Sequence, residues 1–280
     1  MTVRKACVVG WPVDHSRSPL IHRYWLGHHG IDGDYVPVAV SPAGAASFFD
    51  RFIASGFVGG NVTVPHKETA FKSVGATESP AEALGAVNTI WLDNDNRLSG
   101  TNTDSAGFLA NLDSAIPGWS KNGETAVVLG AGGAARAVIW ALLQRDFDPI
   151  VVVNRSAERA RSLSARFGTR VRYADWAGAS DWLSRTDILV NATSLGMAGQ
   201  PPLSIGVTGL RDDAIVNDLV YVPLETALLA SARARRIRTV DGLGMLLHQA
   251  VPGFEKWFGV RPSVTTELRK LVTADLAGSP

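Results

Sequence analysis

Short apolar runs alternate with longer amphipathic segments along most of this chain. In the first half the pattern predicts strands at residues 6–9, 35–40 and 60–64, and helices at residues 20–28, 42–54, 65–74 and 103–114. Residues 87–92 and 97–100 flank the turn-forming residues 93–96, which predicts a β-hairpin. Short strands between helices indicate an α/β protein whose strands form a parallel sheet with right-handed crossovers.

The second half begins as a β-α-β-α-β series. Its successive elements contain the residues Ala126, Ala134, Ile150, Ala157 and Val171. Further strands are predicted at residues 188–190, 214–216 and 238–240. After Gly242 the pattern is helical to about residue 276, and we expect Pro252 and Pro262 to interrupt it.

A glycine-rich turn lies near the middle of the chain, between a buried strand and a helix. Residues 124–136 have the sequence ETAVVLGAGGAAR, in which Gly130, Gly132 and Ala135 take the three positions of the G-x-G-x-x-G/A dinucleotide fingerprint. The small residues permit a tight turn, close approach to a pyrophosphate and close helix packing. An ordinary turn between strand and helix is the alternative.

The end of the next strand indicates which dinucleotide is bound. Asn154 follows Gly130 by 24 residues and is succeeded by Arg155 and Ser156. An NAD enzyme usually has an acid here for the ribose, whereas an NADP enzyme uses arginine for the 2′-phosphate. Arg155 and Arg159 therefore favour NADP, although a solvated helix face also explains such arginines and Glu158 is a counter-signal.

Composition narrows the class of protein. The 280 residues suggest one large or two modest domains, and 46% hydrophobic with 19% charged residues indicates a globular protein with an ample core. A net charge of +1 gives no support to nucleic-acid or membrane-surface binding. No apolar run reaches the roughly 18 residues of a membrane span, and no signal peptide is apparent, so we expect a cytoplasmic protein.

The residues that could bind metal or form disulfides are few. Cys7 is the one cysteine and lies in an apolar strand, which favours a buried structural thiol over a nucleophile. The six histidines are scattered along the chain, so we expect no metal site. His66 is expected to be partly exposed and without a role.

Three loops of the first half contain dense polar chemistry. Ser16 and Ser18 precede a helix and suit a small anion or a polyol, although Ser18 could instead cap that helix. Asn61 and Thr63 point to one face near the end of a strand and lead to Lys67. Lys67 at a helix N-terminus opposes the helix dipole, which is explained by catalysis or by a salt bridge to an acid such as Glu68.

The third loop combines Asn88 with Asp104. Asn88 and the stretch Asn102 to Asp104 flank strands, where amides are disfavoured, and Asp104 could also serve simply as an acid at a helix N-terminus. Ligands bind beyond the carboxyl ends of strands in open α/β sheets. The three loops therefore predict a polar substrate site in the first half of the chain.

Seven motifs in order resemble those of the shikimate dehydrogenase family. They are S-R-S-P, N-V-T-V-P-H-K, G-A-V-N-T, G-T-N-T-D, G-A-G-G-A, N-R-S and D-G-L-G-M-L-L-H-Q, and together they run from about Val8 to Phe258. The resemblance implies an NADP-dependent oxidoreductase of aromatic amino-acid biosynthesis, in the chorismate pathway, that reduces 3-dehydroshikimate to shikimate. It implies a small-molecule substrate, no nucleic-acid or membrane partner, and a monomer or homodimer.

The same resemblance implies a fold and a domain division. It predicts an N-terminal α/β substrate-binding catalytic domain, formed by residues 1–104 with about 245–280. Residues 105–244 would form a Rossmann-type NADP-binding domain, and a C-terminal helix would return to the first domain.

Site residues also follow from the resemblance. Lys67 and Asp104 would be the catalytic pair. Substrate would be bound by Ser16, Ser18, Asn61, Thr63, Asn88, Tyr221 and Gln249. The cofactor would be lined by Gly130, Ala131, Gly132, Gly133, Ala134, Asn154, Arg155, Ser156, Arg159, Thr193, Leu219 and Gly242.

The expected chemistry can be argued from the residues themselves. Reduction of a ketone needs a hydride and a proton. The ammonium group of Lys67 can donate the proton, and the carboxylate of Asp104 would hold the ammonium group in place. A quinate/shikimate dehydrogenase with broader substrate and NAD use is one alternative, which Arg155 and Ser18 disfavour. A non-catalytic nucleotide-binding sensor is another, and it would have no reason to keep Lys67 with Asp104.

Overall fold

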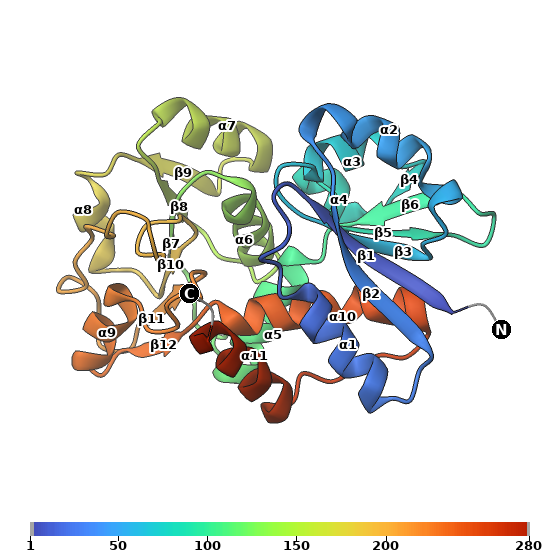
Figure 1. Cartoon of the computed structure of the whole chain (residues 1–280). Helices are drawn as coiled ribbons and strands as arrows, with labels where there is room; N and C mark the ends of the chain where they lie inside the picture. Colours follow the sequence, from blue (N-terminus) through green and yellow to red (C-terminus); the bar gives the residue numbers. More distant parts are fainter. Residues whose placement is uncertain (1–2, 279–280) are drawn as a thin grey trace. The chain divides into compact units, whose positions relative to one another are not determined.

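The computed structural model describes residues 3–278 and divides into two units, each built around its own sheet (Figure 1). The first unit joins the residues up to Thr103 to those from Leu247 onward, and the second runs from Asp104 to Leu246. None of the helices within residues 3–278 is long and apolar enough to cross a membrane.

The first unit contains a six-stranded sheet in the order β2-β1-β3-β5-β6-β4. Its strands are β1 (Arg4–Gly10), β2 (Gly33–Ala39), β3 (Gly59–Val62), β4 (Ala76–Thr77), β5 (Thr89–Leu92) and β6 (Leu98–Thr101). β1 pairs in parallel with β2 and β3, whereas β5 is antiparallel to both β3 and β6. β4 also pairs in parallel with β6, so three of the five strand pairs are parallel as expected, and the predicted hairpin strand β5 forms the two antiparallel pairs.

The helices of this unit lie between its strands along the chain, and α11 comes last. They are α1 (Ser18–His28), η1 (Pro42–Gly44), α2 (Ala45–Asp50), η2 (Phe52–Ser55), α3 (Lys67–Ser73), α4 (Ser79–Leu84) and α11 (Thr266–Gly278). The helix predicted at 42–54 is broken into three short pieces, and α3 begins at Lys67 rather than at Pro65. Cys7 is fully buried in the core against Phe52, Val62 and Ile90, and this burial raises the pKa of its thiol.

The second unit contains a fully parallel six-stranded sheet in the order β12-β11-β10-β7-β8-β9. Its strands are β7 (Ala126–Leu129), β8 (Ile150–Val153), β9 (Val171–Ala174), β10 (Ile188–Asn191), β11 (Ile215–Asp218) and β12 (Arg238–Val240). Read from β9, this is the strand order of a dinucleotide-binding Rossmann domain, with the switch point between β7 and β10.

Helices cover both faces of that sheet. They are α5 (Asp104–Ala115), α6 (Gly133–Leu143), α7 (Ala157–Phe167), α8 (Ala179–Leu183) and α9 (Ala227–Ala234). Along β7, Ala126 and Val128 pack into one hydrophobic cluster, and Val127 and Leu129 pack into the other. Alternate side chains point to opposite faces, so a continuous apolar run is required for a strand that is buried on both sides.

A long helix, α10 (Leu243–Phe258), begins in the second unit and ends in the first. Pro252 lies inside it, so the expected interruption at this proline is wrong. Phe254 and Trp257 beyond the proline are as deeply buried as Leu243 and Leu247 before it. The apolar face on both sides of Pro252 outweighs the one helical hydrogen bond that proline removes.

Candidate functional site

The glycine-rich turn of the second unit has the backbone that a bound pyrophosphate needs. Gly130 has φ of +105°, and a Cβ atom there would lie 3.1 Å from the carbonyl oxygen of Ala192. Gly132 caps α6 without a side-chain hydrogen bond, and no atom lies within 4 Å of a Cβ built on Gly132 or Gly133. The space beside these two glycines at the start of α6 is therefore open, which fits the close approach of a phosphate group to a helix N-terminus.

Thr193 lies against this turn, and Leu219 and Gly242 lie against each other. The Cγ2 atom of Thr193 lies 3.0 Å from the Cβ position of Gly130, which places Thr193 beside the turn. A Cβ on Gly242 would overlap the carbonyl oxygen of Leu219, so these two backbones touch. The second unit thus brings the predicted cofactor residues Gly130 and Thr193 together, and likewise Leu219 and Gly242.

The buried carboxylate of Asp218 holds the ends of β10 and β11 together. Asp218, at the end of β11, accepts hydrogen bonds from Asn191 Nδ2 (2.9 Å), Val220 N (3.0 Å) and Thr226 Oγ1 (2.7 Å). Its burial raises the pKa of Asp218. Asn191 in turn accepts from Thr193 Oγ1 at 2.7 Å. Asp218 therefore couples the loop after β10 to the loop after β11, which contains the half-buried Tyr221.

The end of β8 presents the residues expected at the ribose. Asn154 Nδ2 donates to the carbonyl oxygen of Ser156 at 2.9 Å, and Ser156 Oγ accepts from the Arg159 N–H at 3.3 Å, which caps α7. Arg155 and Arg159 are both exposed. The guanidinium group of Arg161 instead lies over the ring of Tyr173, 5.5 Å from its centre. Arg155 and Arg159 are thus the arginines of this turn that suit a phosphate.

In the first unit, the two serines lie at the start of α1. The Ser18 N–H donates to Ser16 Oγ at 3.3 Å, and Ser18 is buried while Ser16 is half-buried. Arg17 occupies the N-cap position of α1, and its side chain makes no capping hydrogen bond. A capping role for Ser18 is therefore wrong, because Ser18 is already the first residue of the helix.

Asn61 on β3 is only 5% exposed, and its amide is held by internal partners. Its Oδ1 accepts from Tyr35 Oη at 2.7 Å, and its Nδ2 lies within hydrogen-bonding distance of Asn88 O (3.3 Å) and Thr89 Oγ1 (3.2 Å). Thr63, just beyond the strand, is half-buried. Asn61 thus connects the end of β3 to the chain before β5, where Asn88 lies.

Hydrogen bonds and short stretches of backbone connect Lys67 to two other predicted site residues, Asn88 and Gln249. The Lys67 carbonyl oxygen accepts from the N–H of Val87 at 2.9 Å, and Asn88 follows directly. Asn88 Oδ1 accepts from the N–H of Thr103 at 2.8 Å, and Thr103 Oγ1 donates to the carbonyl oxygen of Gln249 at 2.8 Å. Thr103 is the residue before Asp104, which begins α5.

Comparison with known proteins identifies the family. Family models described as the shikimate dehydrogenase substrate binding domain, shikimate / quinate 5-dehydrogenase and the shikimate 5′-dehydrogenase C-terminal domain match residues 8–90, 114–197 and 242–266. A shikimate dehydrogenase (NADP(+)) of Azorhizobium caulinodans is 56% identical over 98% of this chain and 98% of its own length. The chain belongs to the shikimate dehydrogenase family.

Solved structures of the shikimate dehydrogenase family share the fold over nearly the whole chain. Shikimate 5-dehydrogenase from Thermus thermophilus, in complex with NADP(H) and shikimate, is 31% identical with a TM-score of 0.86, over 98% of this chain and 100% of that one. Quinate dehydrogenase from Corynebacterium glutamicum, in complex with NAD, is also 31% identical, with a TM-score of 0.88 over 97% and 99% of the two chains.

His66 differs from its expectation in this member of the family. It is 1% exposed rather than partly exposed, and its Nε2 donates to the carbonyl oxygen of Val40 at 2.6 Å. The bond ties the residue before Lys67 to the end of β2. Sequence reasoning missed this role because Val40 is 26 residues away and no local pattern marks it as a partner.

Two polar residues of the family motifs, Thr89 and Thr103, have no role predicted from the sequence. Thr89 and Thr103 stand next to Asn88 and Asp104, and both are buried in the hydrogen-bonded network. Within residues 3–278, no group of three or more His, Cys, Asp or Glu side chains is arranged to hold a metal ion.

Proposed function

We propose that this chain catalyses the NADP-dependent, reversible reduction of 3-dehydroshikimate to shikimate, in the biosynthesis of aromatic amino acids. The observation that carries the proposal is the 56% identity, over 98% of both chains, to a protein named shikimate dehydrogenase (NADP(+)). The arrangement of this chain's own residues supports it. Predicted site residues such as Asn61 at the end of β3, Lys67 at the start of α3 and Gly130 after β7 occupy the carboxyl ends of strands or the helices that follow them, where ligands of α/β sheets bind.

The unit that carries the glycine-rich turn is proposed to bind NADP. The open N-terminus of α6 would hold the pyrophosphate, with Gly130 to Ala134 along it. Arg155 and Arg159 would bind the 2′-phosphate, with Asn154 and Ser156 shaping the turn. Thr193, Leu219 and Gly242 would line the remainder. Bound NADPH would supply the hydride of the reaction.

The other unit is proposed to bind the substrate. Hydroxyl groups of Ser16 and Ser18 would donate to the substrate carboxylate, and the α1 N-terminus adds a favourable dipole. Thr63, Asn88 and Gln249 would contact the ring hydroxyls. Asn61, whose amide is held by Tyr35 and Asn88, would act on the substrate mainly by fixing Asn88.

Lys67 and Asp104 are proposed as the catalytic residues. The Lys67 ammonium group would donate a proton to the carbonyl oxygen that becomes the new hydroxyl, and would stabilise the negative charge that develops there. The Asp104 carboxylate would hold the ammonium group in place. In the oxidative direction the same pair would take the proton from the hydroxyl of shikimate.

Nicotinamide absorbance with the purified chain tests the proposal. Shikimate and quinate are each offered with NADP and with NAD, and the four initial rates are compared. Rapid reduction of NADP with shikimate supports it, whereas equal or greater rates with quinate and NAD would place the chain with the quinate dehydrogenases. Binding of NADPH with no turnover in any pairing would indicate the nucleotide sensor.

We also propose that the enzyme works in the cytoplasm as a monomer or homodimer. A single, buried cysteine leaves the chain no internal disulfide, which suits a reducing compartment. Sedimentation velocity of the purified chain would distinguish the two oligomeric states.

A further inference from the structure

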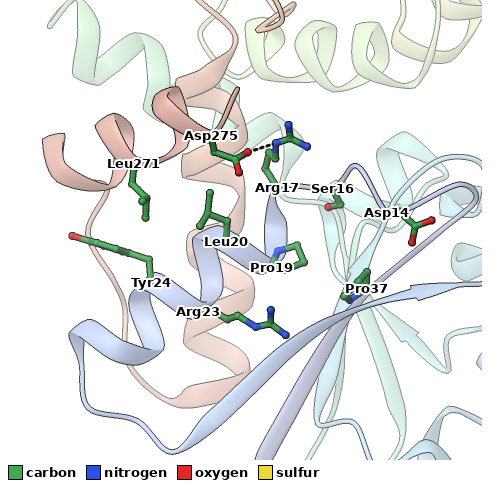
Figure 2. Close-up of a pocket in the computed structure, with 10 residues that line it drawn as sticks. All are labelled: Asp14, Ser16, Arg17, Pro19, Leu20, Arg23, Tyr24, Pro37, Leu271 and Asp275. Carbon is green, nitrogen blue, oxygen red and sulfur yellow. Dashed lines mark ion pairs between the residues drawn. The ribbon is translucent and has the colours of Figure 1, made fainter. Parts of the chain in front are cut away.

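An ion pair joins the loop that contains Ser16 and Arg17 to the C-terminal helix α11. Figure 2 shows Arg17 and Asp275 facing one another at the edge of a pocket of about 610 Å³, with Arg17 Nε 2.6 Å from Asp275 Oδ2. Arg17 stands between Ser16 and Ser18, and Asp275 lies on α11. The pair therefore links the two serines to a helix that is more than 240 residues away in the sequence.

Both charges are unfavourable within their own helices. Arg17 is the N-cap of α1, whose first turn has no acid, although a helix N-terminus repels a cation. Asp275 lies in the last turn of α11, which has no basic residue, although a helix C-terminus repels an anion. Each charge offsets the other, so the pair explains two locally unfavourable positions at once.

The position of α11 is fixed independently of this pair. Leu268 and Val272 on α11 are fully buried. Before the helix, the Trp25 indole N–H donates to the carbonyl oxygen of Ser263 at 3.0 Å, and Tyr24 Oη lies 3.4 Å from Thr265 Oγ1. The helix is thus anchored to α1, and it presents Asp275 to Arg17 as a fixed point.

The same guanidinium group is also held from within the loop. Arg17 Nη1 donates to the carbonyl oxygen of His15 at 2.7 Å, and the Ser16 N–H donates to the carbonyl oxygen of Val13 at 3.0 Å. An arginine that is held at two points restrains the backbone of both neighbouring residues. The hydroxyl groups of Ser16 and Ser18 would then be ordered before a ligand arrives, which lowers the entropic cost of binding.

We propose that the Arg17–Asp275 ion pair positions Ser16 and Ser18 for the substrate carboxylate, so that the C-terminal helix contributes to substrate affinity without touching the substrate. This inference rests on the proposed function. The pair is partly exposed, with side-chain exposures of 18% and 41%, so its effect is expected on loop order more than on the stability of the fold.

Steady-state kinetics of Asp275→Asn test the proposal. We expect the KM for shikimate to rise roughly three- to tenfold, with kcat and the KM for NADP within about twofold of wild type. The methyl ester of shikimate, whose carboxylate is masked, should be used equally well by both proteins. Glu255→Gln is the matched control, because it breaks an exposed ion pair with Arg261 in the same unit.

Two companion variants keep the test decisive. Arg17→Lys retains the charge but loses the two-point contact, so it should raise the KM for shikimate in the same direction. Arg17→Lys combined with Asp275→Asn should raise it no further than the single variants. Thermal melting establishes that each variant folds.

The outcomes separate this inference from the function on which it rests. No turnover of shikimate by the wild-type chain contradicts the proposed function itself. Wild-type turnover with an unchanged KM in a folded Asp275→Asn overturns the positioning role. A lower KM would show that Asp275 acts only by repelling the carboxylate, and an equal loss with the methyl ester would show a general structural effect; each also overturns the proposal.

Discussion

The phenol of Tyr35 donates a 2.7 Å hydrogen bond to Asn61 Oδ1, and both residues are buried. This bond fixes the orientation of the Asn61 amide, so that Nδ2 faces Asn88 and Thr89. The proposed substrate site is therefore supported from β2 by a side chain that forms part of the core.

Substitution of Tyr35 by Phe should loosen that support while keeping the ring. A buried acceptor that loses its donor costs about 1–3 kcal/mol, so the free energy of unfolding should fall by that amount. The KM for shikimate should rise as Asn88 becomes less ordered, while the KM for NADP stays constant. Urea unfolding and steady-state kinetics measure the two effects; an unchanged stability would contradict the role of the phenol.

Substitution of Lys67 by Ala should remove the proton donor. General acid catalysis contributes about a hundred- to ten-thousandfold, so kcat should fall by a factor in that range. NADPH affinity, followed by fluorescence titration, should remain close to wild type. Lys72→Ala, in the last turn of the same helix α3, is the matched control and should retain activity. Wild-type turnover by Lys67→Ala would refute the assignment.

Substitution of Arg159 by Ala should change the choice of cofactor. A charged hydrogen bond to the 2′-phosphate is worth about 1.5–3 kcal/mol, so the ratio of kcat/KM for NADP over NAD should fall roughly ten- to a hundredfold. Arg161→Ala on the same helix removes an arginine that lies over Tyr173, and it should leave the ratio unchanged. Equal losses with both cofactors would exclude contact with the phosphate.

Substitution of His22 by Phe should flatten the pH dependence of stability. Burial lowers the pKa of His22 from 6.5 to about 3, and its ring stacks on Tyr35 with a centroid distance of 4.1 Å. Below pH 6.5 the unfolded chain takes up a proton that the folded chain refuses, so stability falls as pH falls from 6.5 towards 3.

Well below pH 6.5, each further pH unit costs about 1.4 kcal/mol from this group, and close to pH 6.5 it costs about half of that. Between pH 6.5 and 4.5 the wild type should therefore lose about 2 kcal/mol more than His22→Phe, in urea unfolding at each pH. His29→Asn changes an exposed histidine and should follow the wild type. Parallel curves for wild type and His22→Phe would show that another group controls acid unfolding.

The sequence predicts the second unit more closely than the first. β7 and β8 are continuous apolar runs, and the strand β12 at Arg238–Val240 falls at its predicted residues. A parallel sheet that is buried on both faces requires such runs, so pattern and structure agree. Three short elements were not predicted: the helices α4 and α8 and the two-residue strand β4. Segments of two to six residues are too short to show a helical or a strand period clearly.

Local features of the candidate site could be predicted from the sequence, whereas its long-range hydrogen bonds could not. The tight turn at Gly130, with its φ of +105°, and the place of Lys67 in the first turn of a helix follow from the neighbouring residues. The partners of Asn61 and His66 do not, since Tyr35 and Val40 each lie 26 residues away and are brought close only by strand pairing. Family resemblance supplied roles for side chains, but not the buried bonds that hold them.

Helix α10 has a consequence for the order in which the two units can fold. Phe254 and Trp257 fill the core of the first unit, and the Trp257 indole N–H donates to the carbonyl oxygen of Ile90 at 2.8 Å. The second unit is continuous in sequence from Asp104 to Leu246. On the ribosome, therefore, the first 103 residues are made before the residues from Leu247 onward that complete their unit, and we expect the continuous second unit to be able to complete its fold first.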